Sequence, residues 1–449
     1  MSNQDWLRRS FDAVWHPCTQ MKRHERLPIV PIARGEGAWL IDFDGNRYLD
    51  GVSSWWVNLF GHGHPRIRQA IRDQLDQLEH VMLAGFTHRP VVELSERLAK
   101  LSGLGHAFYG SDGASATEIA LKMSFHYWKN SGQPGKTRFI SLENSYHGET
   151  VGALAVTDVP LFSSTYADLL KPGLRAPSPD ARLAAPGESA ADAALRAARS
   201  LENLLAKHCD QIAAVIVEPL VQGAAGMAMH DPVYLTELRR LCDQYQVHLI
   251  ADEIAVGFGR AGSFFAYQQA GITPDFLCLS KGITGGFLPL SCVLTRDAVY
   301  QAFYHDDVAR GFLHSHSYTG NALACAAALA VLDIFEDEDV LAANRVKAEE
   351  WTRKMQPLIA RGDVRHFRHR GMIWAFDVET ERSDFALAYF SAMLKRGCLL
   401  RPIGKTVYFM PPYTLNNEEM DGLVRASLEA LDEVQSSGQS GQGEETPLP

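Results

Sequence analysis

Residues 276–281 have the sequence FLCLSK, in which a mostly apolar run ends at a lysine and continues into GITGG at residues 282–286. A short apolar run that ends at a glycine-rich segment is typical of a buried strand. Three similar runs occur earlier in the chain, at residues 138–142, 213–217 and 247–251. Longer segments with helical spacing separate the runs, which predicts an α/β fold with a mostly parallel sheet.

Polar side chains follow three of the predicted strands. Tyr146 lies in the loop after the first strand, Asp252 comes directly after the third, and Lys281 comes directly after the fourth. Ligands of open α/β sheets bind beyond the carboxyl ends of the strands. These three residues are therefore candidate site residues.

Lys281 stands between the apolar run and the glycine-rich segment, where a lysine needs an explanation. One interpretation is that its ammonium group simply extends into solvent at the strand end. The other is that the amine is desolvated, which lowers its pKa and leaves a neutral nucleophile that condenses with an aldehyde. This second interpretation predicts a Schiff base between Lys281 and pyridoxal phosphate.

Asp252 is the first of two successive acids at a strand end. Its carboxylate could keep the pyridine nitrogen of pyridoxal phosphate protonated, so that the ring accepts electrons from the substrate. A structural alternative is that it caps the next helix or pairs with Arg260. The roles proposed for Asp252 and Lys281 support one another.

Residues 117–129 have apolar side chains at helical spacing, which predicts a mostly buried helix. Ser115 and Glu118 have the spacing of a capping box at its start. The free N–H groups at the start of a helix favour a phosphate, and Gly113 permits close approach of the ligand. A capping box alone is common and assigns no function.

The composition excludes several classes of protein. Of the 449 residues, 46% are hydrophobic and 21% charged, which is typical of a globular enzyme of two or three domains. The net charge of −10 argues against nucleic-acid binding. Seven scattered cysteines without a C-x-x-C pair indicate reduced thiols in a cytoplasmic protein. We expect no signal peptide and no membrane span, because no apolar run is long enough.

Three further patterns are weaker. His314 and His316 have metal-like spacing, but the sequence offers no third ligand, so no metal site is expected. The glycines after residue 281 do not form the G-x-G-x-x-G pattern of dinucleotide-binding enzymes. Trp55 and Trp56 are of a type common in cores and interfaces, and their residue type alone assigns no pocket.

Five ordered motifs resemble those of the class III, ω-type aminotransferases, which have pyridoxal-phosphate fold type I. The similarity extends from about residue 10 to residue 430. The motifs are Ser145-Tyr146-His147-Gly148-Glu149, Val217-Glu218-Pro219 with Gln222-Gly223, Asp252-Glu253-Ile254-Ala255-Val256-Gly257-Phe258-Gly259-Arg260, Ser280-Lys281-Gly282 and Thr319-Gly320-Asn321.

The resemblance implies a large cofactor-binding domain with a mostly parallel sheet and a smaller α+β domain built from both chain ends. We expect residues 61–329 to form the large domain and residues 1–60 with 330–434 to form the small one. The Ser-, Gly- and Pro-rich tail at 435–449 is predicted to be disordered. The resemblance also implies a homodimer with shared active sites.

The same resemblance implies roles for individual residues around pyridoxal phosphate. Lys281, Asp252 and Tyr146 would be catalytic. The cofactor would be bound by Gly113, Ala114, Tyr146, Asp252, Ile254 and Lys281, with His316 and Ser317 contributed by the other subunit. The substrate would be bound by Trp55, Tyr146, Lys281, Ser315 and Arg401, with Arg401 holding a carboxylate in bidentate fashion.

Within the class, the chain is similar to the members that aminate 8-amino-7-oxononanoate in biotin biosynthesis. The relevant residues lie at 15–21, 53–56, 314–317 and 401–413. Position 18 departs from some of these members, which have an aromatic residue where this chain has Cys18. A thiol has neither the reach nor the hydroxyl of a tyrosine, which leaves a substrate role for Cys18 open.

S-adenosylmethionine is the expected amino donor, and lysine, used by some relatives, is the alternative. The segment 15–21 and the paired tryptophans resemble adenosylmethionine users, whereas the run 317–321 also occurs in lysine users. Two other functions remain as alternatives. One is an ω-aminotransferase for simple diamines or amino acids, and the other is a non-catalytic regulator, which would need a basic DNA-binding segment.

Overall fold

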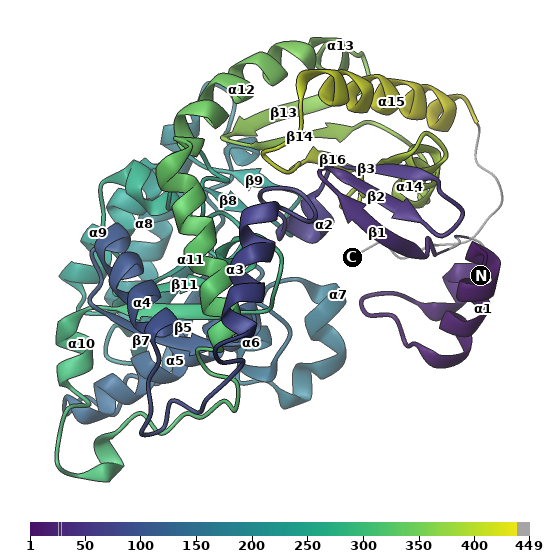
Figure 1. Ribbon diagram of the computed structural model, residues 1–449. Helices are drawn as coiled ribbons and strands as arrows, with labels where there is room; N and C mark the ends of the chain where they lie inside the picture. The colour runs from purple at the N-terminus through teal and green to yellow at the C-terminus, as the bar shows by residue number, and fades with distance from the viewer. Residues whose placement is uncertain (26, 28, 438–449) are drawn as a thin grey trace. The chain divides into compact units, whose positions relative to one another are not determined.

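The computed structural model of the chain describes residues 1–25, 27 and 29–437 (Figure 1). The described residues divide into two compact units, a larger one of residues 66–341 and a smaller one of residues 1–65 and 342–437. The boundary expected at residue 330 falls inside helix α11 (Ala322–Asp337), all of which belongs to the larger unit. Among the described residues, no helix has the length and apolar character needed to cross a membrane.

A seven-stranded sheet forms the centre of the larger unit, with the strand order β4-β12-β11-β10-β7-β5-β6. Only β12 runs antiparallel to its neighbours, β11 and β4. The four strands predicted from sequence are β5, β7, β10 and β11, each within one residue of its predicted bounds. The strands of the sheet are β4 (His106–Gly110), β5 (Arg138–Leu142), β6 (Leu174–Ala176), β7 (Ile212–Val217), β10 (His248–Asp252), β11 (Phe276–Leu279) and β12 (Ser291–Thr295).

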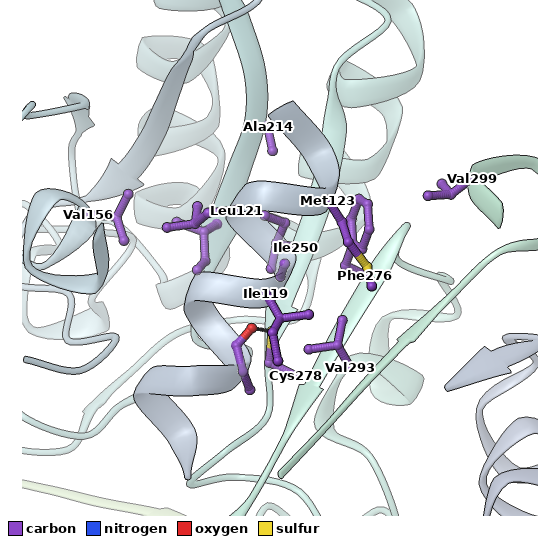
Figure 2. Close-up of a cluster of buried hydrophobic side chains, with 13 residues drawn as sticks. Ile119, Leu121, Met123, Val156, Ala214, Ile250, Phe276, Cys278, Val293 and Val299 are labelled. Atoms are coloured by element: carbon purple, nitrogen blue, oxygen red, sulfur yellow. Dashed lines mark hydrogen bonds between the residues drawn. The ribbon is translucent and has the colours of Figure 1, made fainter. Parts of the chain in front are cut away.

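The central strands β7, β10 and β11 are buried along their whole length because both faces of the sheet are covered. Successive side chains of a strand point to opposite faces, and the neighbours Leu249 and Ile250 are both fully buried. Helix α5 (Gly113–Asn130) covers one face, where its Ile119 joins a cluster with Ile250 and Phe276 (Figure 2). A parallel sheet covered on both faces gives continuous apolar runs rather than alternating ones.

Further helices flank the sheet of the larger unit (Figure 1). A short hairpin, β8 (Val221–Gln222) with β9 (Ala228–Met229), follows β7. The remaining helices are α3 (Pro65–Leu75), α4 (Arg89–Ser102), α6 (Val151–Val156), α7 (Pro160–Ser163), α8 (Ala190–His208), α9 (Val233–Gln244) and α10 (Asp297–Gln301).

The smaller unit contains two sheets. One combines strands from both ends of the chain, and the other has strands from its C-terminal part alone. The first has the order β1-β2-β3-β15, and the second the order β13-β14-β16. The strands are β1 (Ile32–Glu36), β2 (Trp39–Asp42), β3 (Arg47–Asp50), β13 (Val364–Arg370), β14 (Ile373–Val378), β15 (Cys398–Leu399) and β16 (Thr406–Phe409). The helices are α1 (Asn3–Ala13), α2 (Ser53–Trp56), α12 (Val340–Lys354), α13 (Gln356–Ile359), α14 (Phe385–Lys395) and α15 (Asn417–Ser436).

Two local predictions differ from the structure. Helix α5 begins at Gly113, and its N-cap is Asp112, whose carboxylate accepts the N–H of Ser115 at 2.8 Å. The capping box predicted at Ser115 is therefore wrong. At the other end of the chain, α15 extends two residues into the tail predicted to be disordered, and the part of the tail from residue 438 lies outside the described residues.

Candidate active site

Lys281 and Asp252 lie at the same end of the large sheet. Strands β10 and β11 pair in parallel with Asp252 opposite Cys278, and Lys281 follows three residues later. Burial lowers the pKa of the Lys281 amine, and the carboxylates of Asp252 and Glu218 oppose this effect. The amine of Lys281 therefore loses its proton more readily than that of an ordinary lysine, as a nucleophile requires.

The carboxylate of Asp252 is held on both oxygens. Its Oδ2 accepts a hydrogen bond from Nδ1 of the buried His147 at 2.7 Å. Its Oδ1 accepts the N–H of Ile254 at 3.1 Å, so the residue also caps the turn that follows β10. The backbone of His147 is fixed in turn, because its carbonyl accepts the hydroxyl of Thr117 at 2.8 Å and its N–H donates to Thr157 Oγ1 at 2.9 Å. This network orients the carboxylate before any ligand binds.

A second buried carboxylate, that of Glu218, connects two loops at this end of the sheet. It accepts the N–H of Tyr146, after β5, at 3.0 Å and the N–H of Gly223, in the β8–β9 hairpin that follows β7, at 2.9 Å. Burial raises the pKa of Glu218 to about 7, and the nearby Asp252 adds to this effect, whereas His147 opposes it. Glu218 therefore fixes the backbone position of Tyr146, whose hydroxyl donates to Glu149 at 2.9 Å.

The raised pKa of Glu218 predicts a pH dependence of stability in the cofactor-free protein. Between pH 4.5 and 7 the folded protein retains a proton on Glu218 that the unfolded chain has lost. The contribution of Glu218 to the free energy of unfolding therefore falls as the pH rises through this window. We expect this loss to be smaller by about 2 kcal/mol in Glu218→Gln, which cannot titrate. Urea unfolding of both proteins at pH 5 and pH 8 measures the difference, and equal losses would show that Glu218 is ionised throughout.

The start of helix α5 offers a place for an anion. The first N–H groups of a helix, here those of Gly113 and Ala114, have no partner within the helix and suit a phosphate. A Cβ added at Gly113 would lie 3.0 Å from Cγ2 of Ile254, so the helix start lies against the turn that follows Asp252. A nucleophilic amine, an oriented carboxylate and a helix start thus lie at one end of the sheet, as pyridoxal phosphate requires.

The segment from Leu313 to Ser317 lies near helix α5 in the larger unit. His314 Nδ1 accepts a hydrogen bond from Lys122 of α5 at 2.8 Å, and its ring stacks on Phe312 at 5.7 Å between centroids. Ser315 and Ser317 are exposed, and Leu313 is 76% exposed. An apolar side chain this exposed beside polar residues is a feature of interaction surfaces.

The residues of the N-terminal and C-terminal parts of the chain that are expected to bind the substrate lie within the smaller unit. The guanidinium carbon of Arg401 lies 5.2 Å from the ring centroid of Trp55, which is 46% exposed. Arg401 and Cys18 line the same cavity of about 310 Å³, whose other lining residues are mainly apolar, such as Leu27 and Phe390. A cationic group at an apolar hollow suits a ligand with a carboxylate and an aliphatic chain.

Sequence reasoning assigned no role to two residues that the structure places in the site, His147 and Glu218. Glu218 directly follows strand β7, so the rule that selected Asp252 and Lys281 would have found it as well. His147 gave no such signal, because its role depends on a contact with Asp252, 105 residues away in the sequence.

Comparisons with known proteins indicate one family. The class-III aminotransferase family matches residues 20–431. The adenosylmethionine-8-amino-7-oxononanoate aminotransferase of Helicobacter pylori is 47% identical over 94% of this chain and 97% of its own length. The enzyme of the same name from Geobacter sulfurreducens is 39% identical over 94% of this chain and 95% of its own.

Solved structures with the same fold are also aminotransferases. The adenosylmethionine-8-amino-7-oxononanoate aminotransferase of Methanocaldococcus jannaschii superposes with a TM-score of 0.88 at 34% identity, covering 96% of this chain and 99% of the other. An amine transaminase from an uncultivated Pseudomonas species, solved in its pyridoxal-phosphate-bound form, has a TM-score of 0.89 at 34% identity, covering 94% and 99%. This chain belongs to the class-III aminotransferases, and its cofactor is pyridoxal phosphate.

Proposed function

We propose that this aminotransferase converts 8-amino-7-oxononanoate to 7,8-diaminononanoate in biotin biosynthesis, with S-adenosylmethionine as amino donor. The observation that carries the proposal is the 47% identity with the Helicobacter pylori enzyme, whose name includes both compounds. Arg401 beside an apolar hollow supports it, because the ketone substrate has a carboxylate at the end of an aliphatic chain.

Each residue around the cofactor has a proposed role. Lys281 binds the cofactor covalently and moves the proton at the substrate carbon, which its lowered pKa favours. Asp252 pairs with the ring nitrogen, and Tyr146 and Ile254 contact opposite faces of the ring. The N–H groups at the start of α5 bind the phosphate. Pyridoxal phosphate itself carries the amino group between the two substrates and withdraws electrons from the reacting carbon.

Four side chains other than that of Lys281 contact the substrate. Arg401 binds the carboxylate, and Trp55 contacts the substrate with its exposed ring face. Tyr146 and Ser315 also contact the substrate, and Cys18 lines the cavity next to Arg401.

We also propose that two copies of the chain form a homodimer, in which His316 and Ser317 of one copy reach the phosphate bound by the other. The exposed apolar side chains around this segment support an interface here. They are Val308 (71% exposed), Leu313 (76%) and Tyr318 (65%).

A single-turnover assay tests the substrates. The aldehyde form of the enzyme is mixed with S-adenosylmethionine or lysine separately, and its conversion to the pyridoxamine form is followed by visible absorbance. We expect S-adenosylmethionine to convert it and the oxononanoate then to restore the aldehyde absorbance. Conversion by lysine but not by S-adenosylmethionine would identify lysine as the amino donor. Restoration by small ketones but not by the oxononanoate would instead indicate an ω-aminotransferase for simple amines.

A further inference from the structure

Four consecutive residues of the smaller unit have a left-handed backbone. The φ angles of Ser53, Ser54, Trp55 and Trp56 are +52°, +46°, +71° and +73°. None of them is glycine, and each L-residue is strained in this conformation because its Cβ lies too close to the following carbonyl oxygen. Strained backbone of this kind persists only where surrounding contacts impose it, and it is concentrated at functional sites. The left-handed turn therefore needs both a physical cause and a functional explanation.

The cause on one side is the fully buried carboxylate of Asp50, at the end of β3. Its Oδ1 accepts the N–H of Val52 at 3.3 Å and the N–H of Ser54 at 2.9 Å. Its Oδ2 accepts the hydroxyl of Ser54 at 2.7 Å and Nε2 of His62 at 3.1 Å. Four donors thus converge on one carboxylate, two of them from a single residue of the turn.

Strand β16 and the residue that follows it hold the turn from the other side. The buried hydroxyl of Ser53 donates to the carbonyl of Met410 at 2.7 Å, and Nε1 of Trp56 donates to the hydroxyl of Tyr408 at 3.1 Å. Trp56 is thereby fixed inward, with 7% of its surface exposed.

The outward residue is Trp55. Because the residues on both sides of it are fixed, its Cα–Cβ bond has a defined direction, although 46% of its surface is exposed. Its ring faces the guanidinium of Arg401, 5.2 Å from the ring centroid. An exposed tryptophan on a turn of ordinary backbone would adopt several orientations. Restricting it to one of them when a ligand binds costs conformational entropy.

We propose that Asp50 is a positioning residue for substrate recognition, which holds the left-handed turn and thereby keeps the ring of Trp55 beside Arg401. This inference rests on the proposed substrate role of Trp55 and Arg401 and adds the residue that sets their geometry. Asp50 touches neither the substrate nor the cofactor and acts through the turn alone.

Asp50→Asn tests the proposal because it keeps the shape of the side chain but turns one acceptor into a donor. That donor would face Nε2 of His62, which also donates here, since Nδ1 of His62 accepts from the amide of Asn58 at 3.1 Å. We expect the KM for the oxononanoate to rise about tenfold, with kcat changed less than about twofold and cofactor affinity at the wild-type value.

A pair of substitutions at Ser54 tests the turn without changing Asp50. Valine strongly disfavours positive φ, whereas glycine adopts it freely. Ser54→Val should raise KM as Asp50→Asn does, and Ser54→Gly should leave it near the wild-type value. Adding Ser54→Gly to Asp50→Asn should restore part of the lost affinity.

Two further comparisons separate positioning from general loosening. Trp55→Ala should raise KM by itself and show no further rise when combined with Asp50→Asn, because both changes remove the same contact. The matched control is Asp42→Asn, which alters another buried carboxylate of the same sheet. Asp42 accepts from the amide of Asn46 at 2.8 Å and from the hydroxyl of Tyr48 at 3.2 Å. It should lose stability but keep its KM.

A readout on the cofactor-free protein separates this proposal from the proposed substrate. In protein labelled with 5-fluorotryptophan, we expect Asp50→Asn and Ser54→Val to shift or broaden the Trp55 resonance, and Ser54→Gly to preserve it. An unchanged resonance and KM in both of the first two variants would overturn the proposal. A double variant of Trp55→Ala and Asp50→Asn whose KM rises by the product of the two single effects would also overturn it. An equal rise of KM in Asp42→Asn would do the same. A wild-type enzyme that ignores the oxononanoate refutes only the proposed substrate, and the fluorine spectra still decide the role of Asp50.

Discussion

Lys281→Ala is expected to lower turnover by about 10⁴-fold or more, because one amine both binds the cofactor and moves the proton. Burial lowers the pKa of Lys281, so the wild-type amine loses its proton more readily than that of an ordinary lysine. In wild-type protein, borohydride should fix the cofactor covalently to the peptide that contains Lys281. In the variant the cofactor should bind weakly and be lost on dialysis after the same treatment.

Lys136 offers a matched control for this experiment. It is also a buried lysine with a pKa lowered by burial. Its ammonium group, however, donates to the backbone carbonyls of Cys209 and Gln246 at 2.7 and 2.9 Å, so it is occupied in a structural role. Lys136→Met should lose stability and retain full borohydride labelling per folded molecule. Wild-type labelling of Lys281→Ala would show that another lysine holds the cofactor.

The strand-end residues could be predicted from the sequence because one physical cause produces both the strand and its signal. Residues 247–251 and 276–280 are buried throughout and apolar except for His248 and Ser280, since both faces of the sheet are covered. A polar residue directly after such a run must lie at the carboxyl end of the strands. Asp252 and Lys281 lie at the same end of the sheet, as expected.

Local patterns failed where a distant contact decided the outcome. Ser115 and Glu118 have the spacing of a capping box, yet Asp112 caps α5. The carboxylate of Glu118 accepts instead the N–H of Gly152 at 2.7 Å, in the first turn of α6. A spacing rule cannot anticipate a partner supplied by another segment, and here that partner lies 34 residues away.

The turn at Ser53–Trp56 is the strongest case. The left-handed backbone is normally signalled by glycine or asparagine, and neither occurs in these four residues. The contacts that impose it include the bond from Ser53 to Met410, 357 residues away in the sequence. The sequence identified Trp55 only by its resemblance to a family motif, whereas the structure shows how the residue is held.

Asp252→Asn is expected to lower the rate of amino transfer by at least about a hundredfold, the effect of losing one oriented electrostatic partner. The amide has nearly the shape of the carboxylate but carries no charge with which to keep the ring nitrogen protonated. It also places a donor or a weaker acceptor against Nδ1 of His147, which lies 2.7 Å from the wild-type oxygen. The single-turnover rate with saturating amino donor measures the loss, and borohydride labelling of Lys281 should remain near the wild-type yield.

Asp275→Asn provides the control, because Asp275 is a buried carboxylate that directly precedes β11, at the opposite end of the sheet from Lys281. It accepts the N–H of Leu249 at 2.7 Å and pairs with Arg239 at 2.8 Å. Its replacement should lower the free energy of unfolding by about 3 kcal/mol, since it leaves the largely buried Arg239 paired only with the exposed Asp243, while the amino-transfer rate stays within about twofold of wild type. A near-normal rate in Asp252→Asn would show that a different group protonates the ring. Equal rate losses in both variants would show that the effect of Asp252 is only structural. Asp275 belongs to the same sheet but lies at its opposite end, away from Lys281.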